Sequence, residues 1–189
     1  RMEEVLSNPR CGYSVVRPRA MNASTVRATL YEAADDCQSG DEFLVYFGGH
    51  GVLDTLGLVL LLDNSDSDRL LATALPAADL MQAMRGCKAS SRLLILDCCN
   101  AGQITKQTGL RTGRNDRVPM RELVAPDQFE ILLASDVLEP AHELDEQQAG
   151  FMTWALSDAL GANFDEADID GDSAISVEDA IRWLERRAA

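Results

Sequence analysis

The sequence predicts an α/β fold in which helices flank one doubly wound, mostly parallel sheet. Apolar runs of about five β-prone residues recur along the chain and end at glycine or polar residues, as buried strands of parallel sheets do. Segments with helical spacing of apolar residues stand between these runs, and this alternation is typical of parallel α/β sheets. The 189 residues, 46% of them apolar, suffice for one buried core, so we expect one domain.

The individual elements follow from the same patterns. Short runs rich in leucine, β-branched and aromatic residues predict strands at residues 13–16, 43–48, 58–62, 93–97 and 129–134. Apolar residues at helical spacing predict helices at residues 24–36, 76–84, 151–160 and 177–187. The second of these helices begins at a proline and stops at Gly86, in keeping with the usual asymmetry of helix ends. A polar stretch at residues 103–127 precedes the last of these strands.

The chain is strongly acidic. It carries 31 acidic and 17 basic side chains, which gives a net charge of −14. This excess disfavours nucleic acid and anionic membranes as partners, and it favours cationic ligands such as a basic peptide or a divalent metal ion. No apolar run approaches membrane-spanning length. Five cysteines, an odd number with two of them adjacent, suit a reducing compartment better than a disulfide framework, so we expect a cytoplasmic protein.

Two of the predicted strands end on reactive side chains. The strand at 43–48 leads into His50, and the strand at 93–97 leads into Cys98 and Cys99. Open parallel sheets place their ligand sites at the carboxyl ends of strands. An imidazole beside a thiol favours the thiolate and later protonates a leaving amine. Either residue alone is more often structural, but their joint position at two glycine-flanked strand ends favours catalysis.

The motifs Tyr-Phe-Gly-Gly-His-Gly around His50 and Asp-Cys-Cys-Asn-Ala-Gly around Cys99 resemble the catalytic blocks of caspase-like cysteine peptidases, in particular the metacaspase and prokaryotic caspase-homologue branch. The separation of 49 residues between them fits the spacing of about 50 in such enzymes. The resemblance spans roughly residues 13–187. It implies a three-layer sandwich with His50 as the base and Cys99 as the nucleophile, while Cys98 packs inward. Asn100 and Ala101 depart from the histidine and serine common in that branch.

The resemblance also implies an oxyanion site and a substrate pocket. The backbone amides of Gly51 and Cys99 correspond to the family's oxyanion donors, and a glycine turn lets the backbone approach a substrate closely. Metacaspase-like enzymes hold arginine or lysine with acidic groups, and Asp97 stands where those pockets have an aspartate. A carboxylate two residues before the nucleophile lies on the same side of the strand. Asp136 is a second candidate, equally well explained as a solvated loop residue. We expect cleavage after arginine, then lysine.

The stretch at residues 103–121 is rich in basic residues, with only Asp116 opposing them. These residues are Lys106, Arg111, Arg114, Arg117 and Arg121. Their setting among glycine, threonine and asparagine predicts a mobile loop. In related enzymes the stretch after the catalytic cysteine is where self-processing occurs, so these residues are candidates for self-cleavage. A solvated basic loop that balances an acidic body explains them equally well.

The acidic segment near the end of the chain resembles the calcium loop of helix-loop-helix proteins. The carboxylates at loop positions one, three, five and twelve are Asp168, Asp170, Asp172 and Asp179. Ser173 replaces the glycine of the sharp turn, and Asp179 is shorter than the usual glutamate. Ser176 and Asp179 can instead cap the last helix. A calcium ion bound here would tie that helix down, whereas peptide hydrolysis itself requires no cofactor.

Taken together, these features predict a cysteine endopeptidase that acts on proteins or peptides with a basic residue at the cleavage site. We expect a peptidase domain at residues 1–163, with the calcium-loop-like segment and terminal helix at 164–189 packed on it. We also expect an upstream strand and helix in a longer protein, with a regulatory segment or partner. The alternatives are a catalytically silent caspase-like adaptor and a calcium-responsive binding module.

Overall fold

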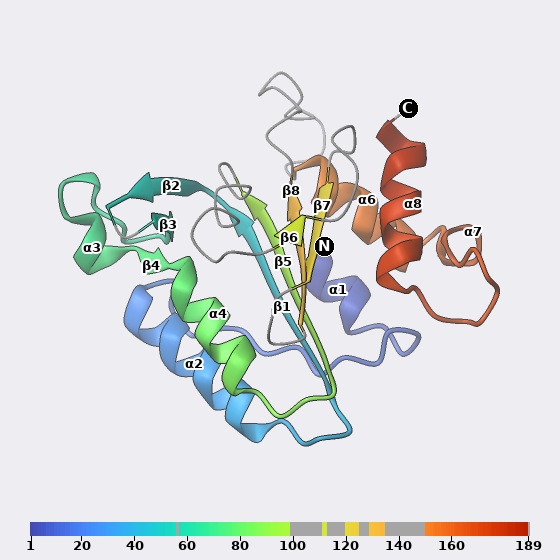
Figure 1. The fold of residues 1–189 in the computed structure, drawn as a ribbon, viewed down its shortest axis with the longest axis horizontal. Helices are drawn as coiled ribbons and strands as arrows, with labels where there is room; N and C mark the ends of the chain where they lie inside the picture. Colours follow the sequence, from blue (N-terminus) through green and yellow to red (C-terminus); the bar gives the residue numbers. More distant parts are fainter. Residues whose placement is uncertain (56, 99–110, 113–119, 125–128, 135–149, 189) are drawn as a thin grey trace. The chain divides into compact units, whose positions relative to one another are not determined.

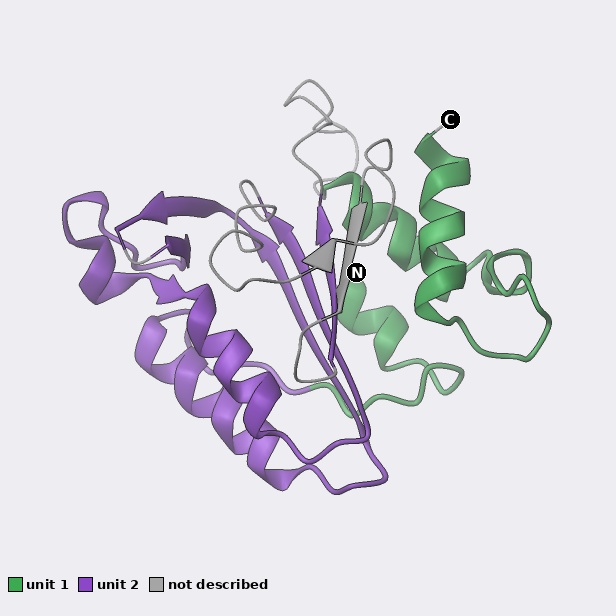
Figure 2. Cartoon of the chain, in the orientation of Figure 1, with its two compact units in different colours: residues 1–15, 117–120, 137–189 green, residues 16–116, 121–136 purple. Residues whose placement is uncertain are grey.

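The computed structural model describes residues 1–55, 57–98, 111–112, 120–124, 129–134 and 150–188. The chain divides into two compact units, shown in Figure 2. Unit 1 contains residues 1–15, 117–120 and 137–189, and unit 2 contains residues 16–116 and 121–136. The domain boundary expected at residue 163 stays a prediction. Among the described helices, none has the length and apolar character needed to cross a membrane.

A five-stranded sheet is the main sheet of unit 2 (Figure 1). In spatial order its strands are β1 (Glu42–Gly49), β5 (Ser91–Cys98), β8 (Glu130–Ala134), β7 (Met120–Val124) and β6 (Arg111–Thr112). Strands β1, β5 and β8 run parallel, whereas β6 and β7 pair antiparallel. The mostly parallel α/β sheet expected from the sequence is therefore confirmed.

The apolar runs of the sequence become the buried strands of this sheet. Leu94 and Leu96 of β5 and Ile131 and Leu133 of β8 are fully buried. Strand β5 has hydrogen-bonded neighbours on both sides, which explains its nearly continuous apolar sequence. Its two neighbours are held in fixed register, so the positions at which the strands end are fixed as well.

Two helices of unit 2 lie side by side in Figure 1, α2 (Ala23–Asp36) and α4 (Ala77–Gly86). The side chain of Asn22 caps α2 by accepting a hydrogen bond from the N–H of Thr25 at 3.0 Å. Leu30 and Ala34 of α2 share one hydrophobic core with leucine and methionine side chains of α4 and with β5 and β8. An ion pair between Arg27 and Asp79, at 2.6 Å, joins the polar sides of the two helices.

A smaller antiparallel sheet follows β1 in unit 2. It contains β2 (Gly51–Asp54), β3 (Gly57–Leu60) and β4 (Leu75–Pro76), with a 3₁₀ turn, η1 (Ser67–Arg69), and α3 (Leu70–Thr73) between the last two strands. All four residues of β3 are buried. The strand expected at residues 58–62 is thus confirmed as β3. Strands β2 and β4 were not expected, because β2 has only two apolar side chains between a glycine and an aspartate, and β4 has only two residues.

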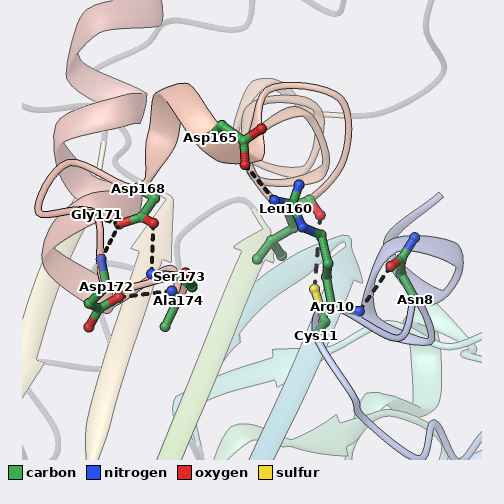
Figure 3. Close-up of polar contacts among 10 residues, drawn as sticks. All are labelled: Asn8, Arg10, Cys11, Leu160, Asp165, Asp168, Gly171, Asp172, Ser173 and Ala174. Carbon is green, nitrogen blue, oxygen red and sulfur yellow. Dashed lines mark hydrogen bonds and ion pairs between the residues drawn. The ribbon is translucent and has the colours of Figure 1, made fainter.

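Unit 1 contains four described helices: α1 (Met2–Leu6), α6 (Phe151–Leu160), α7 (Phe164–Ala167) and α8 (Val177–Ala188). Helix α6 contacts the other three. The chain after α1 is tied to α6 and α7 by polar contacts, since the thiol of Cys11 donates to the carbonyl of Leu160 and Arg10 pairs with Asp165 (Figure 3). Ala159, Ala167 and Trp183 form a small core of their own.

Two expectations about elements are wrong. Residues 13–16 form no strand, because the N–H of Tyr13 donates to the carbonyl of Leu6 at 3.2 Å and Val16 is 61% exposed. Tyr13, Val15 and Val16 give the segment the composition of a strand, but it pairs with no strand among the described residues. The mobile loop expected at residues 103–121 contains β6 and the first residues of β7. Strands pair through backbone groups, so a polar sequence does not exclude them.

Candidate active site

The carboxyl ends of β1 and β5 lie side by side. In the parallel pairing of these strands, Gly48 stands opposite Asp97 and Gly49 opposite Cys98. His50 follows β1 directly and is exposed. The sheet therefore presents the imidazole at the edge where parallel sheets commonly hold ligands. That these two strands are neighbours was expected from the sequence, and it is confirmed.

The two glycines before His50 make room for aromatic side chains. A Cβ atom on Gly48 would lie 2.2 Å from the hydroxyl oxygen of Tyr46, and one on Gly49 would lie 3.1 Å from the ring of Phe47. The two rings thus lean along β1 toward its carboxyl end. Sequence reasoning missed Tyr46, although an aromatic residue two positions before a strand glycine is a usable signal, because both face the same side of the sheet.

The backbone around His50 is held by the small sheet. The carbonyl of His50 accepts a hydrogen bond from the N–H of Leu61 at 2.9 Å. Gly51, buried at the start of β2, pairs with Leu60 of β3. The position of the imidazole along the sheet edge is therefore fixed by main-chain contacts on both sides of it. The role of Gly51 as an oxyanion donor stays a prediction.

Strand β5 ends at Cys98, the first of the two adjacent cysteines. Cys98 is 6% exposed and belongs to the hydrophobic core of unit 2, as expected for the inward-facing member of the pair. Asp97 is half-buried. Several predicted site residues lie outside the described residues, namely Cys99, Asp136, Lys106, Arg114 and Arg117. Arg111 and Arg121 belong to β6 and β7 rather than to a loop.

The comparisons with known proteins agree with this arrangement. The family model described as the caspase domain matches residues 1–172. The chain belongs to the caspase domain family. Searches of curated proteins and of solved structures found no match. Membership makes this caspase domain part of a family of cysteine peptidases that act on proteins, but it leaves the metacaspase branch and the cleavage specificity as proposals.

The acidic loop of this caspase domain lies in unit 1, and the family match ends within it. The carboxylate oxygens of Asp168, Asp170 and Asp172 all lie within 4.8 Å of one another. Asp168 also accepts hydrogen bonds from the N–H groups of Gly171 at 2.8 Å and Ser173 at 2.9 Å (Figure 3). Ser173 has a φ of 70°, so it adopts the left-handed conformation for which the calcium-loop pattern uses glycine. The loop thus has the backbone shape and the oxygen donors that suit a hard cation.

Asp179 has a different setting from the other three aspartates. It is 5% exposed, and its carboxylate accepts hydrogen bonds from Ser176 Oγ, at 2.5 Å, and from the N–H groups of Ser176 and Ile169. Ser176 Oγ in turn accepts from the N–H of Asp179, so the two side chains cap α8 reciprocally. These bonds, chiefly that from Ser176 Oγ, hold the pKa of Asp179 below its ordinary value. The capping interpretation is confirmed, whereas calcium ligation by Asp179 stays a prediction.

Proposed function

We propose that this caspase domain is an active cysteine endopeptidase with a His50–Cys99 dyad. The observation that carries the proposal is the register of β1 against β5, because His50 and Cys99 follow the paired residues Gly49 and Cys98 directly in the chain. Neighbouring strands lie about 4.8 Å apart, a spacing that supports a meeting of the two side chains. The burial of Cys98 supports Cys99 as the thiol that meets substrate.

The reaction follows from these roles. The Cys99 thiolate attacks the scissile carbonyl carbon, and the amides of Gly51 and Cys99 donate to the oxyanion that forms. The His50 imidazolium protonates the leaving amine, so the C–N bond breaks and a thioester remains. His50 then takes a proton from water, whose oxygen attacks the thioester. The carboxylic acid product leaves, and the thiol is restored.

We further propose that the substrate carries arginine or lysine at the cleavage site. Asp97 is half-buried and stands at the carboxyl end of β5, opposite Gly48 at the same edge of the sheet as His50. A partly desolvated carboxylate binds a guanidinium more strongly than an ammonium, because the guanidinium offers two parallel N–H donors. The acidic net charge supports the same preference. Asp136 remains a second candidate for this pocket.

A fluorogenic peptide panel with Arg, Lys or Asp at the cleavage position tests both proposals. Cys99→Ala and His50→Ala should each lower kcat/KM by about 10³-fold or more, whereas Cys98→Ala should keep turnover within several-fold. Asp97→Asn should lower kcat/KM for the arginine peptide by about 10-fold to 100-fold and leave an uncharged peptide nearly unchanged. Turnover after aspartate alone would contradict the pocket, and a folded protein without turnover would indicate a silent adaptor.

Self-processing is proposed for the basic segment at residues 106–121. Its arginines and lysine match the preferred residue, and β6 and β7 pair on either side of residues 113–119. Intact mass after incubation should show cuts in this segment for the wild type and none for Cys99→Ala. An active enzyme that stays whole would exclude self-cleavage there.

Calcium binding is a second candidate function, favoured by the three gathered carboxylates of Asp168, Asp170 and Asp172. The ion would stabilise unit 1 and take no part in hydrolysis. Thermal unfolding with added CaCl₂ should show a rise in Tm for the wild type that Asp170→Asn reduces. An equal rise in both proteins, or none in either, would exclude this loop.

A further inference from the structure

Two cysteines occupy equivalent positions at the ends of neighbouring helices in unit 2. Cys37 follows α2 and Cys87 follows α4, and each is the C-cap residue of its helix. Their backbone angles are nearly the same, with φ −64° and ψ 141° at Cys37 and φ −68° and ψ 137° at Cys87. Each cysteine therefore turns the chain out of a helix and toward the strand that follows, β1 or β5.

The two turns are fastened to one another. The N–H and the hydroxyl of Ser90 both donate to the carbonyl of Asp41, at 3.0 and 3.2 Å. Immediately beyond, Glu42 pairs with Ser91 as β1 and β5 begin. Figure 1 shows α2 and α4 side by side, leading into these strands. The backbone thus holds the segments that carry the two cysteines at a fixed separation.

The thiols pack together within this frame. Cys87 is 4% exposed and lies in the main hydrophobic core, and Cys37, which is half-buried, packs against the same core. Cys87 lies close enough to Cys37 to add to the effect of burial in raising the pKa of the Cys37 thiol. Cys37 Sγ also donates to the carbonyl of Ala33 at 3.3 Å, and the N–H of Ala89 donates to Cys87 Sγ at 3.5 Å. In such a pair, the half-buried thiol of Cys37 can attack an oxidant, and the buried thiol of Cys87 can then attack Cys37 to complete a disulfide.

We propose that Cys37 and Cys87 form a reversible disulfide that links α2 to α4. The oxidant is a small disulfide such as oxidised glutathione. The Cys37 thiolate attacks one of its sulfurs, which breaks the small disulfide and releases one thiol. The Cys87 thiolate then attacks the sulfur of Cys37 and releases the second. Two protein thiols are oxidised and one small disulfide is reduced, and the two protons pass from the protein thiols to the released thiolates.

The environment of Cys37 makes this reaction slow at neutral pH. Burial, the neighbouring Cys87 thiol and the nearby carboxylates of Asp41 and Asp36 raise the pKa of Cys37 to about 11. Only the thiolate attacks, and below the pKa its fraction rises about tenfold per pH unit. The rate of disulfide formation should therefore rise about tenfold per unit between pH 7 and pH 9. The pair stays reduced under mild conditions and responds to sustained oxidation.

The disulfide would close the chain between residues 37 and 87 and restrict the unfolded state. A loop of this length is expected to raise Tm by about 5–10 °C. The link lies at the amino ends of β1 and β5, whereas His50 follows the carboxyl end of β1. Oxidation of this pair should therefore change stability while peptide turnover stays within about twofold.

Oxidised glutathione, applied to the wild type, Cys37→Ser, Cys87→Ser and a Cys11→Ser control, tests the proposal. After thiol alkylation, peptide mapping should show a link between residues 37 and 87 in the wild type and in Cys11→Ser, with the rise in Tm reversed by dithiothreitol. Cys87→Ser should stop at a glutathione adduct on residue 37, and Cys37→Ser should show neither link nor adduct there. If a serine variant does not fold, the peptide map and the Tm of the oxidised wild type still test the proposal.

Three outcomes would overturn the proposal. One is a glutathione adduct on Cys37 of the wild type with no link to Cys87. Another is a link that joins either residue to a different cysteine. The third is a mapped link that leaves Tm unchanged, because a disulfide at this position must restrict the unfolded chain. None of these outcomes depends on peptidase activity, so they are separable from failure of the proposed function.

Discussion

Gly48 stands two residues before His50, and the ring of Tyr46 leaves no room for a side chain at this position. A Cβ atom there would lie 2.2 Å from the hydroxyl oxygen and 2.9 Å from Cζ of Tyr46. Gly48→Ala should therefore displace the phenol ring and lower the free energy of unfolding by about 1–3 kcal/mol in urea titrations. Gly86→Ala, where a Cβ atom would meet nothing within 4 Å, is the matched control and should be neutral or slightly stabilising.

A double-mutant cycle with Tyr46→Ala tests whether the loss of stability in Gly48→Ala comes from the clash with the Tyr46 ring. In a Tyr46→Ala background the added methyl group meets no phenol, so Gly48→Ala should cost much less than in the wild type. Equal costs in both backgrounds would show that the backbone of β1, rather than Tyr46, requires glycine.

The lowered pKa of Asp179 gives a second residue-scale prediction. A carboxylate with a depressed pKa in the folded state stabilises the protein above its ordinary pKa, and this contribution is lost as pH falls through the folded value. Asp179→Asn should cost about 1–2 kcal/mol at pH 7 and at pH 5, and this difference should shrink below about pH 4. Glu178→Gln removes an exposed partner of Arg182 and should cost less than about 0.5 kcal/mol. A constant difference from pH 7 to pH 3 would contradict the capping role.

At the scale of elements, one side chain joins α8 to α6. The guanidinium of Arg187 lies over the rings of Trp154, at 5.4 Å, and Trp183, at 4.7 Å, and it pairs with Asp158 at 2.5 Å. The side chain is 35% exposed, so solvent screening keeps its contribution modest. Arg187→Ala should cost about 1 kcal/mol in unfolding free energy and change tryptophan fluorescence. The exposed neighbour Arg186, changed to alanine, should do neither, and an equal effect of both would contradict the stacking role.

The elements also show which parts of the fold the sequence could predict. β1, β5 and β8 could be predicted because each contains a nearly continuous run of apolar residues. Such runs are typical of strands in a parallel sheet that is covered on both faces. β2, β4 and β6 were missed because none of them contains a run of more than two apolar residues, whereas β3 belongs to the longer apolar run that follows Gly57. The strand expected at residues 13–16 was wrong because a local pattern cannot show that a partner is absent.

The candidate site was predictable to the same extent. His50 and Cys98 could be placed from the sequence because each adjoins a recognisable strand end, and the structure brings these strand ends together. The hydrogen bond from Leu61 to His50 and the proximity of Cys37 to Cys87 could not be predicted, because each depends on the packing of segments that are separate in sequence.

At the scale of the whole molecule, the dominant property is the net charge of −14. Such a charge attracts cationic substrates over distances of the Debye length, and salt shortens that length. Encounter with a basic peptide should therefore weaken as ionic strength rises, whereas encounter with an acidic peptide should improve. The direction in which salt changes kcat/KM therefore distinguishes the long-range effect of the net charge from contacts in the pocket.

Two peptides with the same arginine at the cleavage position, one with lysine-rich and one with glutamate-rich flanks, test this property. Between about 0.05 M and about 0.5 M NaCl, kcat/KM should fall several-fold for the first peptide and rise for the second. The opposite signs follow because the pocket contact is common to both peptides and only the long-range interaction differs. Parallel changes in the two peptides would mean that salt acts on the enzyme itself, and the overall charge would then have no part in substrate selection.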